Sequence, residues 1–178
     1  AVRIAHTVLA HGARRLAVAY LNEAVALRQA GVEAPILIPG YLPPWQARAA
    51  LLHNVTCAVF SEEVVQALSA AARDLRSVAR VHLKVDTGMG RLGLFPEEVL
   101  PFLERVGHLP GILWEGIFTH FSVADDPDED PYTEEQIQKF VALLEELERA
   151  GFRFPLVHAS NSAALLRFPQ ARFNLVRP

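Results

Sequence analysis

Short apolar runs alternate with amphipathic segments along the whole chain. The pattern predicts seven buried strands, at residues 16–20, 35–38, 56–60, 79–86, 114–119, 156–159 and 173–176. It predicts helices at residues 4–12, 22–31, 43–52, 61–73, 96–107 and 133–151, and a short one from Ser162. Strands that are separated by helices pair in parallel, because a parallel neighbour needs a crossover connection.

Two architectures fit alternating strands and helices: an open doubly wound sheet and a (β/α)8 TIM barrel. Neither a dinucleotide-binding glycine fingerprint nor a phosphate-binding GxxxxGK[ST] loop occurs. Seven strands are many for an open sheet in 178 residues, and the chain begins with a predicted helix. The simplest prediction is an incomplete (β/α)8 barrel that holds strands two to eight, as a single partial domain over residues 1–178.

Composition excludes several classes of protein. Seventeen basic and twenty acidic residues give a net charge of -3, which argues against a nucleic-acid-binding surface. No apolar run reaches the roughly 18 residues of a membrane span. The lone Cys57 cannot form an internal disulfide, and the first residues lack the form of a signal peptide. These features fit a protein of the reducing cytoplasm.

Reactive side chains follow four of the predicted strands. Barrel active sites lie at the carboxyl ends of the strands, so these residues are expected to share one site. The candidates are Lys84 and Arg91 after the fourth run, His120 after the fifth, His158, Asn161 and Ser162 at the sixth, and Arg177 after the last.

Each candidate also has a structural interpretation. His120 alone is more often a hydrogen-bonded structural histidine, Ser162 fits a helix N-cap, and Arg177 fits a surface position. A helix that begins near Ser162 could equally bind phosphate. Lys84 is harder to dismiss, since a buried ammonium needs a partner, and Asp86 lies on the same strand face.

Two further features have plain interpretations. The acidic run at residues 125–130 lacks EF-hand spacing and is expected to be a solvated loop, so no metal site is predicted. Lys139 is the only lysine besides Lys84, and the acidic and amide residues around it indicate a solvated helix face.

Several motifs closely resemble those of bacterial alanine racemases. They are VHLKVDTGMGRLG at 81–93, GIFTHF at 116–121, HASNSAA at 158–164 and FNLVRP at 173–178, and residues 15–31 are also similar. The resemblance covers essentially the whole chain. It implies a pyridoxal 5'-phosphate enzyme on a (β/α)8 barrel, an isomerase that interconverts L-alanine and D-alanine for peptidoglycan of the cell wall. It also implies a homodimer in the cytoplasm.

The resemblance assigns cofactor contacts to five residues. Arg177 would face the pyridine nitrogen, which it would keep unprotonated. His120 would pack against the cofactor ring and join a polar network with Arg177 and His158. Ser162, with Asn161 and neighbouring backbone N–H groups, would hold the phosphate.

The resemblance also implies roles for the residues after the fourth predicted strand. Arg91 would lie near the phenolic oxygen of the cofactor and the carboxylate of the substrate. Lys84 matches a family lysine that is often carbamylated. Its carbamate would be an anion that holds Arg91, whereas an unmodified ammonium would repel it.

The two catalytic bases of the family have no counterpart in residues 1–178. One is the Schiff-base lysine of the first strand, and the other is a tyrosine from a C-terminal domain of the partner subunit. We therefore expect a fragment of an alanine racemase that is inactive alone. Two alternatives stay open: a non-catalytic barrel fragment that binds pyridoxal phosphate or phosphate only, and a racemase of serine, lysine or broad specificity.

Overall fold

A computed structural model describes every residue from Ala1 to Pro178. Six strands form one sheet in chain order. They are β1 (Leu16–Ala17), β2 (Ile36–Ile38), β3 (Val55–Val59), β4 (Ala79–Lys84), β5 (Ile112–Phe118) and β6 (Leu156–His158). The pairs β1–β2, β2–β3 and β5–β6 are parallel. Strand order and pairing confirm the expected incomplete (β/α)8 architecture.

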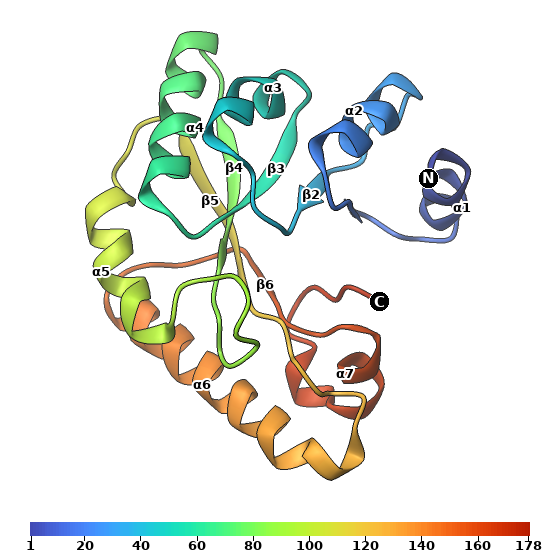
Figure 1. The fold of residues 1–178 in the computed structure, drawn as a ribbon, viewed down its shortest axis with the longest axis vertical. Coiled ribbons are helices and arrows are strands. Elements are labelled where there is room, and N and C mark those ends of the chain that lie inside the picture. The colour runs from blue at the N-terminus through green and yellow to red at the C-terminus, as the bar shows by residue number, and fades with distance from the viewer. The chain divides into compact units, whose positions relative to one another are not determined.

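Each strand is followed by a helix, as Figure 1 shows. The α-helices are α1 (Val2–Ala10), α2 (Leu21–Gln29), α3 (Ala47–Leu52), α4 (Glu62–Leu75), α5 (Pro96–Val106), α6 (Asp130–Arg149) and α7 (Ser162–Arg167). Three short 3-10 helices are η1 (Pro44–Gln46), η2 (Pro127–Glu129) and η3 (Pro169–Ala171). The chain divides into two compact units, residues 1–82 with 106–113, and residues 83–105 with 114–178.

The first unit is built on β2 and β3, whose residues are all buried. Strands covered on both faces read as continuous apolar runs, which is why both were recognisable in the sequence. Ser61 begins α4 as expected, because its hydroxyl accepts the backbone N–H of Val64 at 3.4 Å. Arg76 ends this helix in the left-handed conformation.

The second unit packs β5, β6 and α6 around aromatic side chains. Phe118 and Phe140 are almost fully buried. The Phe140 ring meets Phe173 edge-on, with 5.4 Å between ring centroids. This contact anchors the end of the chain, which delivers Arg177 to the site described below.

The seventh predicted strand, at 173–176, is wrong as a strand. The structure has only an isolated bridge between His158 and Leu175. Phe173 takes a positive φ of 45°, and the Asn174 side chain accepts the backbone N–H of Val157 at 2.8 Å. The side chain of Asn174 thus replaces the backbone ladder that a strand would need.

Among the helix starts that differ from the prediction, two have a clear local cause. The second helix begins at Leu21, with the Glu23 carboxylate accepting the backbone N–H groups of Ala19 and Tyr20, so Asn22 is not its cap. The longest helix begins at Asp130 rather than Thr133. Proline fits the first turn of a helix because that turn has no use for its N–H, so Pro131 does not delay the start.

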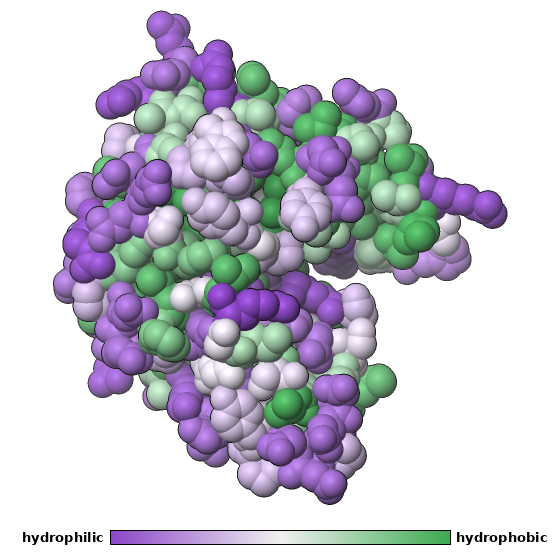
Figure 2. Space-filling model, viewed as in Figure 1, coloured by the Kyte–Doolittle hydropathy of each residue, from purple (hydrophilic) through white to green (hydrophobic).

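The outer faces of the helices differ in polarity. Figure 2 shows hydrophilic residues along the outer face of α6 and hydrophobic ones over α1, where Ile4 is 69% exposed. No helix combines the length and the apolar composition that crossing a bilayer requires.

Candidate active site

Lys84 ends β4 with its side chain inside the second unit. The residue is 5% exposed, and its ammonium lies 4.6 Å from the centroid of the Phe118 ring. Burial lowers the pKa of Lys84 to about 8, and the nearby charges of Arg177 and Arg91 act in the same direction. A substantial share of this amine is therefore neutral, and nucleophilic, in weakly alkaline solution.

Asp86 organises the loop that follows β4. Its carboxylate accepts the backbone N–H groups of Gly88 at 2.9 Å, Gly90 at 3.1 Å and Arg91 at 3.0 Å. Burial acts to raise the pKa of Asp86, but these N–H groups outweigh it and lower the pKa. Asp86 thus holds the loop, and its charge also acts to raise the pKa of Lys84, against the larger effect of burial.

The loop closes back onto its own strand at Gly93. Leu94 donates its N–H to the Lys84 carbonyl at 3.0 Å and accepts that of Asp86 at 2.8 Å. Gly93 has a φ of +126°, and a Cβ there would lie 2.7 Å from the Asp86 nitrogen and 2.8 Å from the Val85 carbonyl carbon. Only glycine fits, and the closed loop holds Arg91 at the surface.

Arg177 connects the ends of β5 and β6. One terminal nitrogen of its guanidinium donates to the carbonyls of Thr119 at 3.0 Å and Ala159 at 3.2 Å, and lies 3.4 Å from His120 Nδ1. The other bonds to Nδ1 of His158. Burial lowers the pKa of Arg177 to about 10, so it stays charged at neutral pH.

Both histidines are held as acceptors by this contact. His158 also stacks on Phe118, with 4.6 Å between ring centroids. Burial lowers the pKa of His120 to about 4, and the charges of Arg177, Lys84 and Arg91 act in the same direction. His120 is therefore neutral at pH 7, and its proton belongs on Nε2 because Nδ1 faces the Arg177 donor.

A backbone hydrogen bond links Arg177 to the segment just before α7. Asn161 is the cap, since its side chain accepts the N–H of Ala164 at 2.9 Å, so the structural interpretation of Ser162 as the cap is wrong. Ser162 is the first helical residue and is exposed. Its link to the other candidates is indirect: the Arg177 N–H donates to the carbonyl of Ser160 at 3.0 Å.

Sequence reasoning missed several residues of this cluster. Phe118 lies under both Lys84 and Arg177, whose guanidinium carbon is 5.2 Å from the ring centroid. The hydroxyls of Thr87 and Thr119 bond to each other at 2.8 Å between β4 and β5. Thr119 directly follows β5, and Thr87 directly follows the strand predicted at 79–86, so that position was the available signal.

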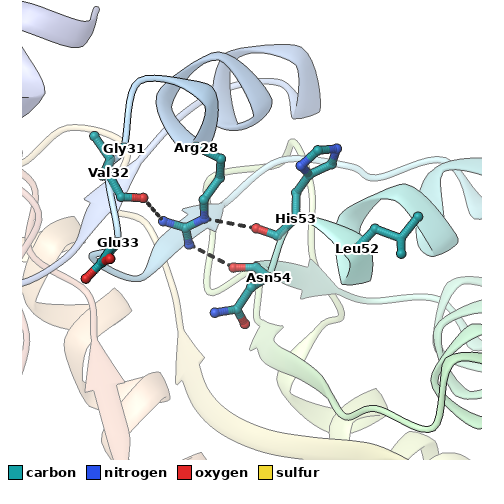
Figure 3. A pocket seen from close by; sticks show the side chains of 7 residues that line it. All are labelled: Arg28, Gly31, Val32, Glu33, Leu52, His53 and Asn54. Atoms are coloured by element: carbon teal, nitrogen blue, oxygen red, sulfur yellow. Dashed lines mark hydrogen bonds between the residues drawn. The ribbon is translucent and has the colours of Figure 1, made fainter.

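The structure also has a pocket in the first unit, and none of the predicted candidates lines it. Figure 3 shows Arg28 reaching across it to backbone carbonyls. Its Nε donates to His53 at 2.9 Å, and its terminal nitrogens donate to the carbonyls of Val32, Ala34 and Asn54 at 2.6 to 2.9 Å. This arginine is engaged in joining the segments that precede β2 and β3.

The remaining predictions concern charged surface groups. Residues 125–129 are exposed as expected, and Asp130 pairs with Arg167 at 2.6 Å. Lys139 pairs with Glu135 at 2.7 Å on an exposed face of α6. No group of three or more histidine, cysteine, aspartate or glutamate side chains is arranged to hold a metal ion.

The second unit therefore gathers three cations, Lys84, Arg91 and Arg177, whose charges act together on His120. The single carboxylate beside them, Asp86, already accepts backbone N–H groups. Fold and site together define a (β/α)8-type domain with a cationic site at the carboxyl ends of β4, β5 and β6.

Comparison with known proteins identifies the family. The profile described as alanine racemase, N-terminal domain, matches residues 1–178, and the chain belongs to this family. An alanine racemase of Desulforamulus reducens is 47% identical over an alignment of 179 residues, which covers all of this chain and 48% of that protein. The chain spans about half the length of the curated relatives it matches.

Solved structures agree in fold. An alanine racemase of Clostridium difficile in complex with cycloserine has a TM-score of 0.94 and 36% identity, over 99% of this chain and 48% of that one. The Bacillus anthracis alanine racemase with bound L-Ala-P has a TM-score of 0.91 and 39% identity, over 99% of this chain and 45% of that one.

Proposed function

We propose that this chain supplies the cofactor- and substrate-binding barrel of an alanine racemase that uses pyridoxal 5'-phosphate. Membership of the family supports the reaction. The observation that supports the site is the convergence of Lys84, Arg177 and His158 on the Phe118 ring, with His120 beside Arg177.

The residues present fit this cofactor. Pyridoxal phosphate carries a phosphate and a phenolic oxygen, and the amino-acid substrate adds a carboxylate. The cluster offers guanidinium and ammonium donors with one carboxylate that is already engaged. The cofactor, when bound, withdraws electrons from the α-carbon of the amino acid, so that its proton can leave and return on either face.

Arg177 is proposed to face the pyridine nitrogen. A guanidinium donates hydrogen bonds and keeps its proton, so it holds that nitrogen unprotonated. His120, which is neutral at pH 7, and His158 accept from the guanidinium and keep it in place. Asn161 and Ser162, with backbone N–H groups at the start of α7, are proposed to hold the phosphate.

Arg91 is proposed to bind the phenolic oxygen and the substrate carboxylate, and Lys84 is proposed to be carbamylated. The neutral amine of Lys84 adds to carbon dioxide, forming one N–C bond and releasing one proton, and the anionic carbamate then holds Arg91. Peptide mass spectra taken without acid should show a gain of about 44 Da on Lys84. An unmodified amine in bicarbonate-equilibrated protein would contradict the modification.

The wider biological roles follow from the same proposal. We propose a homodimer in the cytoplasm that supplies D-alanine for peptidoglycan. We also propose that residues 1–178 form a single partial domain, which is supported by β4 and β5, since each contributes residues to both compact units.

The test is an assay of the complete protein that contains this chain, loaded with pyridoxal phosphate. L-alanine should be converted to a mixture with D-alanine, faster than L-serine or L-lysine at equal concentration. Residues 1–178 alone should show no turnover. Complete protein that is loaded with cofactor and leaves L-alanine unchanged would overturn the proposal, and preference for L-serine or L-lysine would reassign the substrate.

A further inference from the structure

Gln136, on α6, is a fully buried amide, with 0% of its surface exposed. Its amide oxygen accepts both the backbone N–H and the hydroxyl of Ser122, each at 3.1 Å. Its amide nitrogen donates to the Thr87 hydroxyl and to the His120 carbonyl, each at 3.4 Å. One side chain thus contacts the segments that follow both β4 and β5.

Tyr132 makes a second contact one turn earlier on the same helix. Its hydroxyl donates to the Gly88 carbonyl at 2.8 Å. Gly88 has a φ of +137°, and a Cβ there would lie 2.4 Å from the Tyr132 oxygen. Residues four apart share a helix face, so Tyr132 and Gln136 act from one side of α6 on adjoining parts of the site.

The partners of Gln136 lie next to the candidate catalytic groups. Thr87 follows Asp86, which holds the loop of Arg91, and bonds to the Thr119 hydroxyl. The Thr119 carbonyl in turn accepts from Arg177. Hydrogen bonds therefore link Gln136 to Thr87 and Thr87 to Thr119, whose backbone carbonyl accepts from Arg177.

We propose that Gln136 is a positioning residue, which sets the placement of His120 and of the Thr87–Arg91 loop relative to Arg177. The inference rests on the proposed racemase function. Burying an amide is unfavourable unless its donors and acceptors are satisfied, and here they are satisfied by groups of the site. Loss of this link should shift the reacting groups without removing any of them.

The test uses the complete protein, loaded with pyridoxal phosphate. Gln136→Met keeps the length of the side chain and removes all its hydrogen bonds. Gln136→Glu keeps the acceptor for Ser122 and removes the donor to Thr87 and His120. Gln138 is exposed on the same helix, so Gln138→Met and Gln138→Glu are matched controls.

Turnover per bound cofactor should fall about 10- to 100-fold in both Gln136 variants, because small misplacements of reacting groups have effects of this size. The KM for alanine should rise as well, because Arg91, which is proposed to bind the substrate carboxylate, lies on the displaced loop, and the Gln138 controls should match the parent. If Gln136→Met does not fold, Gln136→Glu gives the answer. Turnover within about twofold of the parent in a folded Gln136 variant overturns the inference.

Amide hydrogen exchange makes the inference independent of the reaction. Peptides that cover residues 87–94 and 119–123 should exchange faster in the Gln136 variants and not in the Gln138 controls. If the loaded parent does not racemise alanine, the proposed function fails, and exchange alone decides the inference. Unchanged exchange in both segments would then overturn it.

Discussion

Arg28 and Arg177 both bond to backbone carbonyls near the ends of strands. Arg28 bonds to carbonyls alone, before β2 and β3, and uses all three of its nitrogens. Arg177 bonds to two carbonyls after β5 and β6 and also to the imidazoles of His120 and His158. The two arginines thus differ in two ways. Arg28 bonds at the amino ends of strands and to carbonyls alone, as a structural arginine does, whereas Arg177 bonds at the carboxyl ends and also to imidazoles of the candidate active site.

The largest effect is expected from Arg177→Lys in the complete protein. Lysine keeps the charge but cannot reproduce the planar fork that serves two histidines and two carbonyls. Turnover should fall about 100- to 1,000-fold, in the range seen when one preorganised donor is removed from a site. Steady-state kinetics measure the loss, and the melting temperature is the control. Turnover close to that of the parent would contradict the proposed role.

Arg28→Leu should have the opposite profile. Four backbone carbonyls lose a charged donor, so the free energy of unfolding should fall by about 3 kcal/mol. Turnover per folded, cofactor-loaded molecule should not change. Urea unfolding together with kinetics separates the two effects. A turnover defect in folded Arg28→Leu protein would remove the distinction between the two arginines.

Gly93→Ala tests the loop that holds Arg91. The added Cβ would meet the backbone of Val85 and Asp86, and the positive φ adds strain, so unfolding free energy should fall by about 2 kcal/mol. Gly90→Ala is the matched control: it also has a positive φ, but nothing lies within 4 Å of its added Cβ. Equal losses in the two variants, measured by urea unfolding, would show that the close approach at Gly93 has no effect.

The neutral state of His120 predicts a pH dependence of stability. Its pKa is about 4 in the folded protein against an ordinary 6.5, so the unfolded chain binds more protons between these values. Stability should therefore fall as the pH drops from 6.5 towards 4, and this contribution should be constant above that range. Urea unfolding at several pH values measures it, and His120→Asn should reduce the slope. An unchanged slope in that variant would place the proton uptake elsewhere.

The smallest effect is expected at Lys139. It forms an exposed pair with Glu135, and such pairs contribute little to stability. Lys139→Gln should change neither the melting temperature nor the binding of pyridoxal phosphate. A loss of cofactor binding in this variant would show that the wrong lysine has been assigned to the site.

The elements that could be predicted from the sequence are those set by local chemistry. Buried parallel strands such as β3 are continuous apolar runs, and Ser61 is a strong cap signal, so both were found. The strand predicted at 173–176 does not form, because the Asn174 side chain bonds to the carbonyl of Pro155 and to the N–H of Val157. The hydrophobic pattern along the chain gives no information on contacts between segments that are distant in the sequence.

The same limit applies to the site. Residues at strand ends, such as Lys84 and His120, were recognisable because the topology places them together. Strand alternation placed Asp86 on the same face as Lys84, but it gave no sign of the backbone donors that the turn at Gly88 to Arg91 brings to the Asp86 carboxylate. Gln136 contacts Ser122 and His120, 14 and 16 residues away, and Thr87, 49 residues away, so only the folded structure shows its partners.

The most direct test of the central claim is a crystal structure of the complete protein with pyridoxal phosphate bound. The account predicts that the pyridine nitrogen faces the Arg177 guanidinium and that the phosphate meets Ser162 at the start of α7. A cofactor that lies elsewhere, or a phosphate bound beside Arg28 instead, would contradict it.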